Sequence, residues 1–184
     1  MNQPFDSGAE LLQVYDEDGA VLAPLSRAEV HAKPLQHWHG VANVWLVNRR
    51  GEIIVSKRST RVGGNPGKWQ SYFGGHVSAG LTHREVAVKE LAEEAGLEIN
   101  GADLYLIDKG KRASADHLHF YESYAFLYEG DISELDFADG EVSEAKWLSL
   151  DEYERESKER PDEWCNDCDQ ENQSRIRQWL SNLK

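Results

Sequence analysis

The sequence predicts an α/β fold in which helices cover a mixed central sheet. Two observations favour this α/β/α sandwich: short apolar runs bounded by turn residues are interspersed with amphipathic stretches, and capping patterns mark helix starts. The chain has 184 residues, 40% of them apolar, which fits one compact core. We expect one domain, with an N-terminal β-hairpin extension over residues 1–35 and C-terminal helices over residues 150–184.

The first third of the chain is predicted to be mostly β-structure. Apolar runs at residues 11–15 and 21–25 flank Asp16-Glu17-Asp18-Gly19, a composition typical of a hairpin turn. A second hairpin is expected from residues 41–47 and 53–56. The polar, glycine-rich stretch that follows, residues 59–69, predicts a loop of the kind that can cover a site.

The best-defined helix is expected over residues 83–95. Thr82 and Glu85 form a capping-box pattern at its start, and Gly96 supplies the stop. Apolar residues recur at helical spacing and should face a sheet; they are Val88, Leu91, Ala92 and Ala95.

The rest of the chain alternates between short apolar runs typical of strands and amphipathic stretches typical of helices. Strands are expected at residues 104–107, 119–128 and 145–148, with an acidic loop over residues 131–141. Ser149 with Glu152 indicates another capped helix, which should end before Pro161. A last helix is expected near the end of the chain, with an apolar stripe formed by Ile176, Trp179, Leu180 and Leu183.

Composition narrows the range of partners. Twenty basic against 33 acidic residues give a net charge of −13, which disfavours long nucleic acids as partners. No apolar run is long enough to cross a bilayer, and no signal peptide is evident, so a cytoplasmic protein is expected. A small anionic substrate is compatible with this negative charge if a divalent cation lies between the protein carboxylates and the substrate phosphates. A homodimer is left open.

Three carboxylates on the predicted helix carry the main chemical signal. Glu90, Glu93 and Glu94 share one face at spacings i, i+3 and i+4, where like charges repel unless a cation binds. Alone, this pattern also fits a solvated acidic face. The glycine-rich segment at residues 74–80 leads directly into the helix, and its backbone can approach a phosphate or a metal closely. Loop and helix together predict one site.

The segment at residues 75–97 resembles the Nudix box. The matching residues fall in register without a gap: Gly75, Glu90, Leu91, Glu93, Glu94, Gly96 and Leu97. The resemblance implies a Nudix hydrolase that cleaves a phosphoanhydride bond with Mg²⁺ or Mn²⁺ held by the three glutamates and the Gly75 carbonyl. Leu81 stands where the box has its first glutamate, and Lys89 replaces its arginine, which puts efficient turnover in doubt.

Over roughly residues 10–155 the chain is similar to the Nudix subgroup around isopentenyl diphosphate isomerase. This makes an isomerase the first rival function, with a non-catalytic Nudix-fold binding protein as another. In the isomerase a cysteine precedes the Gly-His pair, whereas Gly74 stands there in this chain. By an approximate alignment, His117 and His119 replace two glutamates of the isomerase. Both departures argue against isomerisation.

Histidines suggest a second divalent-metal site. His117 and His119 are spaced by two and would share a strand face, and His39 and His76 resemble isomerase metal ligands. We therefore consider a zinc or manganese site built from these four residues. The alternative is a set of partly exposed histidines that bond to neighbouring groups.

The resemblance also suggests further functional side chains. The general base is expected to be Glu93, or else Glu141 or Glu144 on the segment before Trp147. Possible substrate contacts lie in and around the glycine-rich loops: Arg58, Lys57, Lys68, Gly74 and His76. Trp38 and Trp69 are candidates for stacking, although tryptophan packs in cores more often than it binds ligands. The substrate would be a small nucleoside diphosphate-linked or related compound.

Overall fold

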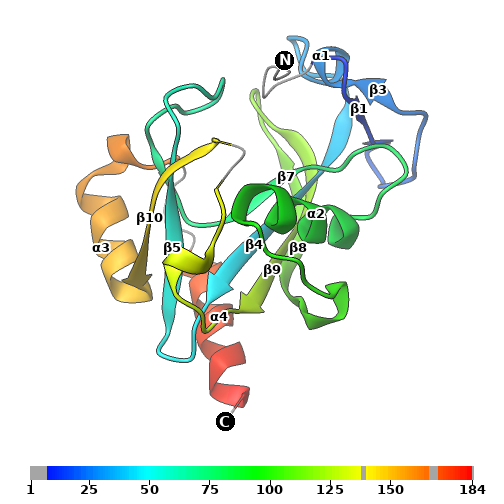
Figure 1. Cartoon of the computed structure of the whole chain (residues 1–184). Helices are drawn as coiled ribbons and strands as arrows, with labels where there is room; N and C mark the ends of the chain where they lie inside the picture. The colour runs from blue at the N-terminus through cyan, green and yellow to red at the C-terminus, as the bar shows by residue number, and fades with distance from the viewer. Residues whose placement is uncertain (1–7, 138–139, 166–169, 184) are drawn as a thin grey trace.

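The computed structural model describes residues 8–137, 140–165 and 170–183. A central sheet with helices packed on it forms the body of the molecule (Figure 1). This sheet has eight strands. Its main path runs through β10 (Val142–Ser149), β5 (Glu52–Arg58), β4 (Trp38–Val47), β9 (Leu118–Leu127) and β8 (Tyr105–Ala113). Strands β4 and β9 pair in parallel, whereas the other pairs are antiparallel. The predicted mixed sheet is therefore confirmed.

Three short strands add to this path. β2 (Val14–Tyr15) and β7 (Phe73–His76) both pair with β4, and β6 (Trp69–Gln70) pairs with β5. Directly paired residues share a face of the sheet. In β4, Ala42, Val44 and Leu46 face one core, whereas Trp45 and Val47 face the other.

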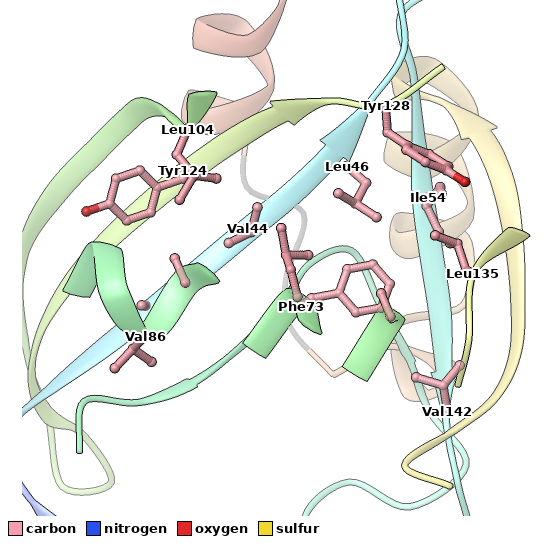
Figure 2. Close-up of a cluster of buried hydrophobic side chains, with 14 of the residues drawn as sticks. Val44, Leu46, Ile54, Phe73, Val86, Leu104, Tyr124, Tyr128, Leu135 and Val142 are labelled. Carbon is pink, nitrogen blue, oxygen red and sulfur yellow. The ribbon is translucent and has the colours of Figure 1, made fainter. Parts of the chain in front are cut away.

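Helices cover both faces of the sheet, which confirms the sandwich. α2 (His83–Ala95) packs on the first core, which Figure 2 shows between Val44 and Leu46 of β4, Phe73 of β7 and Val86 of α2. α3 (Leu150–Glu159) and α4 (Gln170–Asn182) pack on the opposite core through Tyr153, Ile176 and Trp179. Among the described residues, no helix is long and apolar enough to cross a membrane.

The N-terminal hairpin is present but divided. β1 (Leu11–Leu12) pairs with β3 (Leu25–Ser26), and the Asp16 side chain closes the expected turn by accepting bonds from two backbone amides. β2 leaves this small sheet to pair with β4, since β4 offers a free edge there. The short helix α1 (Arg27–Val30), capped by Ser26, was not predicted from the sequence.

The second hairpin departs further from expectation. β4 and β5 pair only where Val47 faces Ile53, next to the turn. Beyond that point β7 pairs with β4, and β10 and β6 pair with β5. Gly74 allows this close approach of β7, because a Cβ there would collide with the backbone carbonyl of Ala42.

Helix α2 has the predicted bounds and the predicted capping box. Thr82 accepts a bond from the Glu85 amide, and Gly96 ends the helix in the left-handed conformation. The predicted apolar stripe was partly wrong, because Ala92 is exposed and Val88 only partly buried. Leu91 and Ala95 are buried as predicted, and the buried face also carries Val86, Ala87 and Glu94, because the helix packs on both β4 and β7.

The remaining predicted elements are present. Strand β8 runs past its predicted end to Ala113, β9 lies one residue earlier than predicted, and the capping box at Ser149 and Glu152 starts α3 as expected. Three single-turn 3₁₀ helices complete the structure: Gly101–Asp103, Ile132–Glu134 and Pro161–Glu163. The last of these and the start of α4 lie over the sheet face opposite α2, where a cavity forms between them.

Candidate metal and phosphate site

Two glycines of β7 place their backbone against the carboxylates of α2. The Gly74 amide donates a 3.1 Å hydrogen bond to Oε2 of Glu94. At Gly75 a Cβ would lie 2.5 Å from Oε1 of Glu90, so only glycine leaves room for that carboxylate. The loop and the helix predicted to form one site are thus in direct contact.

The three glutamates differ sharply in exposure. Glu94 is 6% exposed and the Glu90 side chain 16%, whereas the Glu93 side chain is 55% exposed. The alternative of a solvated acidic face is therefore wrong for two of the three. The reason is that α2 turns this face toward β7, where glycines make space for carboxylates.

Burial gives Glu90 an unusual proton affinity. Its pKa is raised to about 7, first because burial disfavours the charged form. The nearby carboxylates of Glu93, Glu141 and Glu10 act in the same direction, and Lys89 opposes them. Near neutral pH, Glu90 is therefore poised between its protonated and ionised forms. A cation binding beside it would favour the carboxylate.

Lys89, which replaces the arginine of the box, remains an ion-pair partner. Its Nζ lies 2.5 Å from Oε2 of Glu93 and 3.7 Å from Oε1 of Glu90. Burial lowers the pKa of Lys89, but the hydrogen bond to Glu93 and the charges of both glutamates outweigh it and raise the pKa overall. Lysine thus keeps the positive charge between the two glutamates without the planar fork of arginine.

These donors fit a hard divalent cation. All are oxygens, the chemistry that Mg²⁺ and Mn²⁺ prefer, and a buried carboxyl with a raised pKa gains its charge partner when a cation binds. Among the described residues, a tighter ligand group within 4.8 Å is formed only by His31, His39 and His76.

This histidine trio is the second cluster of the molecule. Nε2 of His31 lies 3.1 Å from Nε2 of His76, and Nδ1 of His39 is buried without a hydrogen-bond partner. The predicted set needs correction: His31, the residue that ends α1, belongs to the trio and was missed. His119 is next to His39, with ring centroids 5.8 Å apart, whereas His117 is exposed, with its ring beside that of His119.

Three imidazoles of this region, those of His39, His76 and His119, have lowered pKa values and are neutral at physiological pH. Burial lowers the pKa of His39 to about 3, and the charges of neighbouring His31, His119 and Arg27 add to this effect. Burial likewise lowers the pKa of His119 to about 4 and that of His76 well below its ordinary value. Neutral rings have free lone pairs, which is the form that ligates metals.

The other predicted residues fall into different places. Glu141 acts electrostatically on Glu90, but Glu144 is exposed on β10, where it pairs with Lys57 in the sheet, and nothing links it to the α2 carboxylates. Arg58 is held by the Gly64 carbonyl at 2.8 Å and by Gln70 at 3.0 Å.

The two tryptophans named as stacking candidates pack within the protein. Trp69 is buried in the core opposite α2, with Lys57 over its ring. Trp38 stacks on Phe120, and Lys111 covers it. Lys68 is half-buried beside Trp69 at the end of the loop.

A cavity of about 690 Å³ opens on the sheet face opposite α2. Its floor comes from β4 and β9 and its cover from α4 and the last 3₁₀ helix; lining residues include Asn43, Tyr121, Ser123, Tyr153, Asn172 and His119. Gly74 pairs with Asn43 and His76 with Val41, so both lie on this face. Sequence reasoning missed this cavity, because its walls come from distant segments.

A mixed-sheet sandwich with a glycine loop leading into a carboxylate helix defines a class of phosphate-cleaving, metal-using proteins. The family model described as "NUDIX domain" matches residues 37–167, so this chain belongs to the Nudix hydrolase family. Membership indicates a divalent-metal-dependent enzyme acting on diphosphate bonds in small substrates.

Individual relatives are distant. An uncharacterised Nudix hydrolase of Nostoc is 28% identical over 141 residues, which cover 76% of this chain and 80% of the relative. An isopentenyl-diphosphate Delta-isomerase of Corynebacterium glutamicum is 29% identical over 50% of this chain and 48% of its own length. The crystal structure of DR0079 from Deinococcus radiodurans has a TM-score of 0.70 at 20% identity, covering 92% of this chain and 98% of that protein. The last likeness supports the fold alone.

Proposed function

We propose that this protein hydrolyses a phosphoanhydride bond in a small nucleoside diphosphate-linked or related substrate, with Mg²⁺ or Mn²⁺ held by Glu90, Glu93, Glu94 and the Gly75 carbonyl. The observation that carries this proposal is the buried Glu90 carboxyl against Gly75, with a pKa raised to about 7. Lys89 favours the carboxylate but does not restore its ordinary pKa. A divalent cation beside it would supply the further positive charge that stabilises the ionised form.

Each residue then has a distinct task. When bound, the cation neutralises the diphosphate and acidifies bound water. The Gly74 amide fixes the Glu94 carboxylate, and the Glu90 carboxylate fits against Gly75. The oxygens of both carboxylates are thereby positioned as ligands for the cation. Glu93 is exposed and Glu141 lies within electrostatic reach of Glu90, so either can accept the proton of the attacking water. We retain Glu93 as the first candidate for the base.

The substrate's organic group is assigned to the 690 Å³ cavity. Gly74 and His76 of β7 pair with Asn43 and Val41, which line the cavity. Polar lining side chains such as Asn43 and Ser123 are proposed to supply hydrogen bonds. Arg58 directly precedes the loop over residues 59–69, and Lys68 lies near the end of that loop. Both are proposed to contact phosphate. A cavity with this lining suits a polar ring system better than a hydrocarbon chain.

Isomerisation is the weaker alternative. The isomerase chemistry implied by the resemblance needs a cysteine where Gly74 stands. In this chain Gly74 has φ +154° and its missing Cβ would collide with the Ala42 carbonyl, so the backbone does not accept a side chain there. A cysteine at this position would need a different local backbone, which argues against isomerase activity.

The proposal is tested by a substrate screen with Mg²⁺ over nucleotide, sugar-nucleotide and prenyl diphosphates, read by phosphate release and mass spectrometry. Cleavage by wild type that is lost in Glu94→Gln and after chelation supports it. Uncleaved but isomerised prenyl diphosphate would favour the isomerase. No reaction with any compound, despite cation binding, would favour a binding protein.

A second divalent metal is proposed at His31, His39 and His76, with His119 beside them. Three imidazoles with ligand atoms within 4.8 Å, and a buried His39 Nδ1 without a hydrogen-bond partner, suit an ion such as zinc. Elemental analysis of the purified protein should find this metal, and His39→Gln should remove it. The matched control His37→Gln, two residues earlier, should retain it. Equal metal content in both variants would refute this site.

A further inference from the structure

We infer that Glu10, from the N-terminal segment, supplies the negative charge that the Nudix box lacks at Leu81, acting as a positioning residue for the carboxylate site. This inference rests on the proposed function. Leu81 is an apolar residue packed against the core beneath α2, so the box itself carries no carboxylate at that position. Another segment must provide one if the site is to be complete.

The N-terminal strand is built onto the glycine-rich loop. The Gln13 amide donates a 2.8 Å bond to the Val77 carbonyl, and the Ala79 amide donates a 2.9 Å bond to the Leu11 carbonyl. Between them, Leu12 and Ser78 form an antiparallel bridge. Residues far apart in sequence are thereby held in fixed register, and Glu10 lies at the end of this pairing.

The side chain of Glu10 reaches the loop directly. Ser78 Oγ donates a 3.2 Å hydrogen bond to its Oε1, and Arg27 Nη1 lies 3.3 Å from its Oε2. These contacts orient the carboxylate, which is 35% exposed. The charge of Glu10 acts on both Glu90 and Lys89, two neighbouring box residues that form an ion pair on α2.

This placement assigns Glu10 two effects. Through Ser78 it steadies the loop that precedes α2, and through its charge it strengthens the pull of the site on a cation. The first effect needs only a hydrogen-bond acceptor, whereas the second needs a negative charge. Glu10→Gln keeps the acceptor and removes the charge, so it separates the two.

The test measures Mn²⁺ binding to the metal-free protein by electron paramagnetic resonance, with the Mg²⁺ dependence of hydrolysis as a second measurement. Loss of an outer carboxylate is expected to weaken Mn²⁺ affinity about tenfold in Glu10→Gln, with a parallel rise in the Mg²⁺ needed for half-maximal rate. Glu17→Gln, an exposed carboxylate on the same segment, should match wild type. The unfolding midpoint of the metal-free protein should stay unchanged in both.

Three results would overturn the inference in distinguishable ways. Mn²⁺ affinity in Glu10→Gln within twofold of a wild type that binds Mn²⁺ and hydrolyses substrate would reject the role of Glu10 alone. Wild-type protein that binds no Mn²⁺ would reject the proposed function, and the role of Glu10 with it. An equal loss of Mn²⁺ affinity in Glu17→Gln would show that the effect comes only from the net negative charge of the N-terminal segment.

Discussion

Gly75 and Glu90 fit each other closely: a Cβ on the glycine would lie 2.5 Å from Oε1 of the glutamate. Gly75→Ala must therefore push the Glu90 carboxylate out of place. Because displacements of about 1 Å can cost roughly 100-fold in rate, we expect kcat/KM to fall about 100-fold or more. Steady-state kinetics and Mn²⁺ binding measure this.

The control for this substitution is Gly64→Ala. A Cβ at Gly64 meets nothing within 4 Å, so activity should stay within twofold of wild type. If Gly75→Ala behaved like this control, the Glu90 carboxylate would not need its position against the loop.

The raised pKa of Glu90 predicts how the stability of the metal-free protein depends on pH. In the unfolded chain this glutamate titrates near its ordinary value of 4.5, whereas in the folded protein it titrates near 7. The folded state therefore binds more protons between these values, and stability that is present below about pH 4.5 is lost as pH rises through 7. The shift corresponds to at most about 3 kcal/mol.

Urea unfolding at pH 5 and pH 8 measures this effect. The histidine cluster acts in the opposite direction, since its lowered pKa values give stability that is lost as pH falls, so only the difference between variants is informative. Glu90→Gln should gain stability relative to wild type at pH 8 and little at pH 5. An equal difference at both pH values would contradict the prediction. Added Mg²⁺ should reverse the order at pH 8.

Local sequence patterns predicted some parts of this site well. The bounds of α2 follow from the Thr82 and Glu85 capping box and from Gly96, all within one segment, and the box places Glu90, Glu93 and Glu94 on that helix. These features depend on contacts between residues a few positions apart, which periodicity and capping describe directly.

Other parts of the site depend on long-range pairing that no local pattern records. Glu94 is buried because β7 pairs with β4 and leaves a glycine amide facing it. His31, the residue after α1, joins His39 of β4 and His76 of β7 only through the tertiary fold, and Glu10 reaches Ser78 beside the bridge between Leu12 and Ser78, which are 66 residues apart in sequence. A pairing register of this kind is set by the whole sheet.

Thr82 caps α2 but does not position its carboxylates. Thr82→Ala removes the bond to the Glu85 amide and should lower the free energy of unfolding by about 1 kcal/mol. Because packing on β7 holds Glu90 and Glu94 two turns further on, kcat should change less than threefold. Urea unfolding and kinetics test both expectations. Ser149→Ala, which removes the equivalent cap of α3, should give a similar loss of stability. A large fall in kcat in Thr82→Ala alone would mean that the cap sets the site geometry.

The cavity opposite α2 should decide which substrates bind rather than how fast they react. Asn43 lies on its floor, between Gly74 of β7 and Ser123 of β9 in the sheet. Asn43→Leu keeps the size of the side chain but removes its hydrogen bonds, so KM for the cleaved substrate should rise about tenfold while kcat changes less than threefold. Gln178→Leu, an amide exposed on α4, is the matched control and should leave both constants unchanged. An unchanged KM in Asn43→Leu would place the organic group of the substrate outside this cavity, on the α2 side of the sheet.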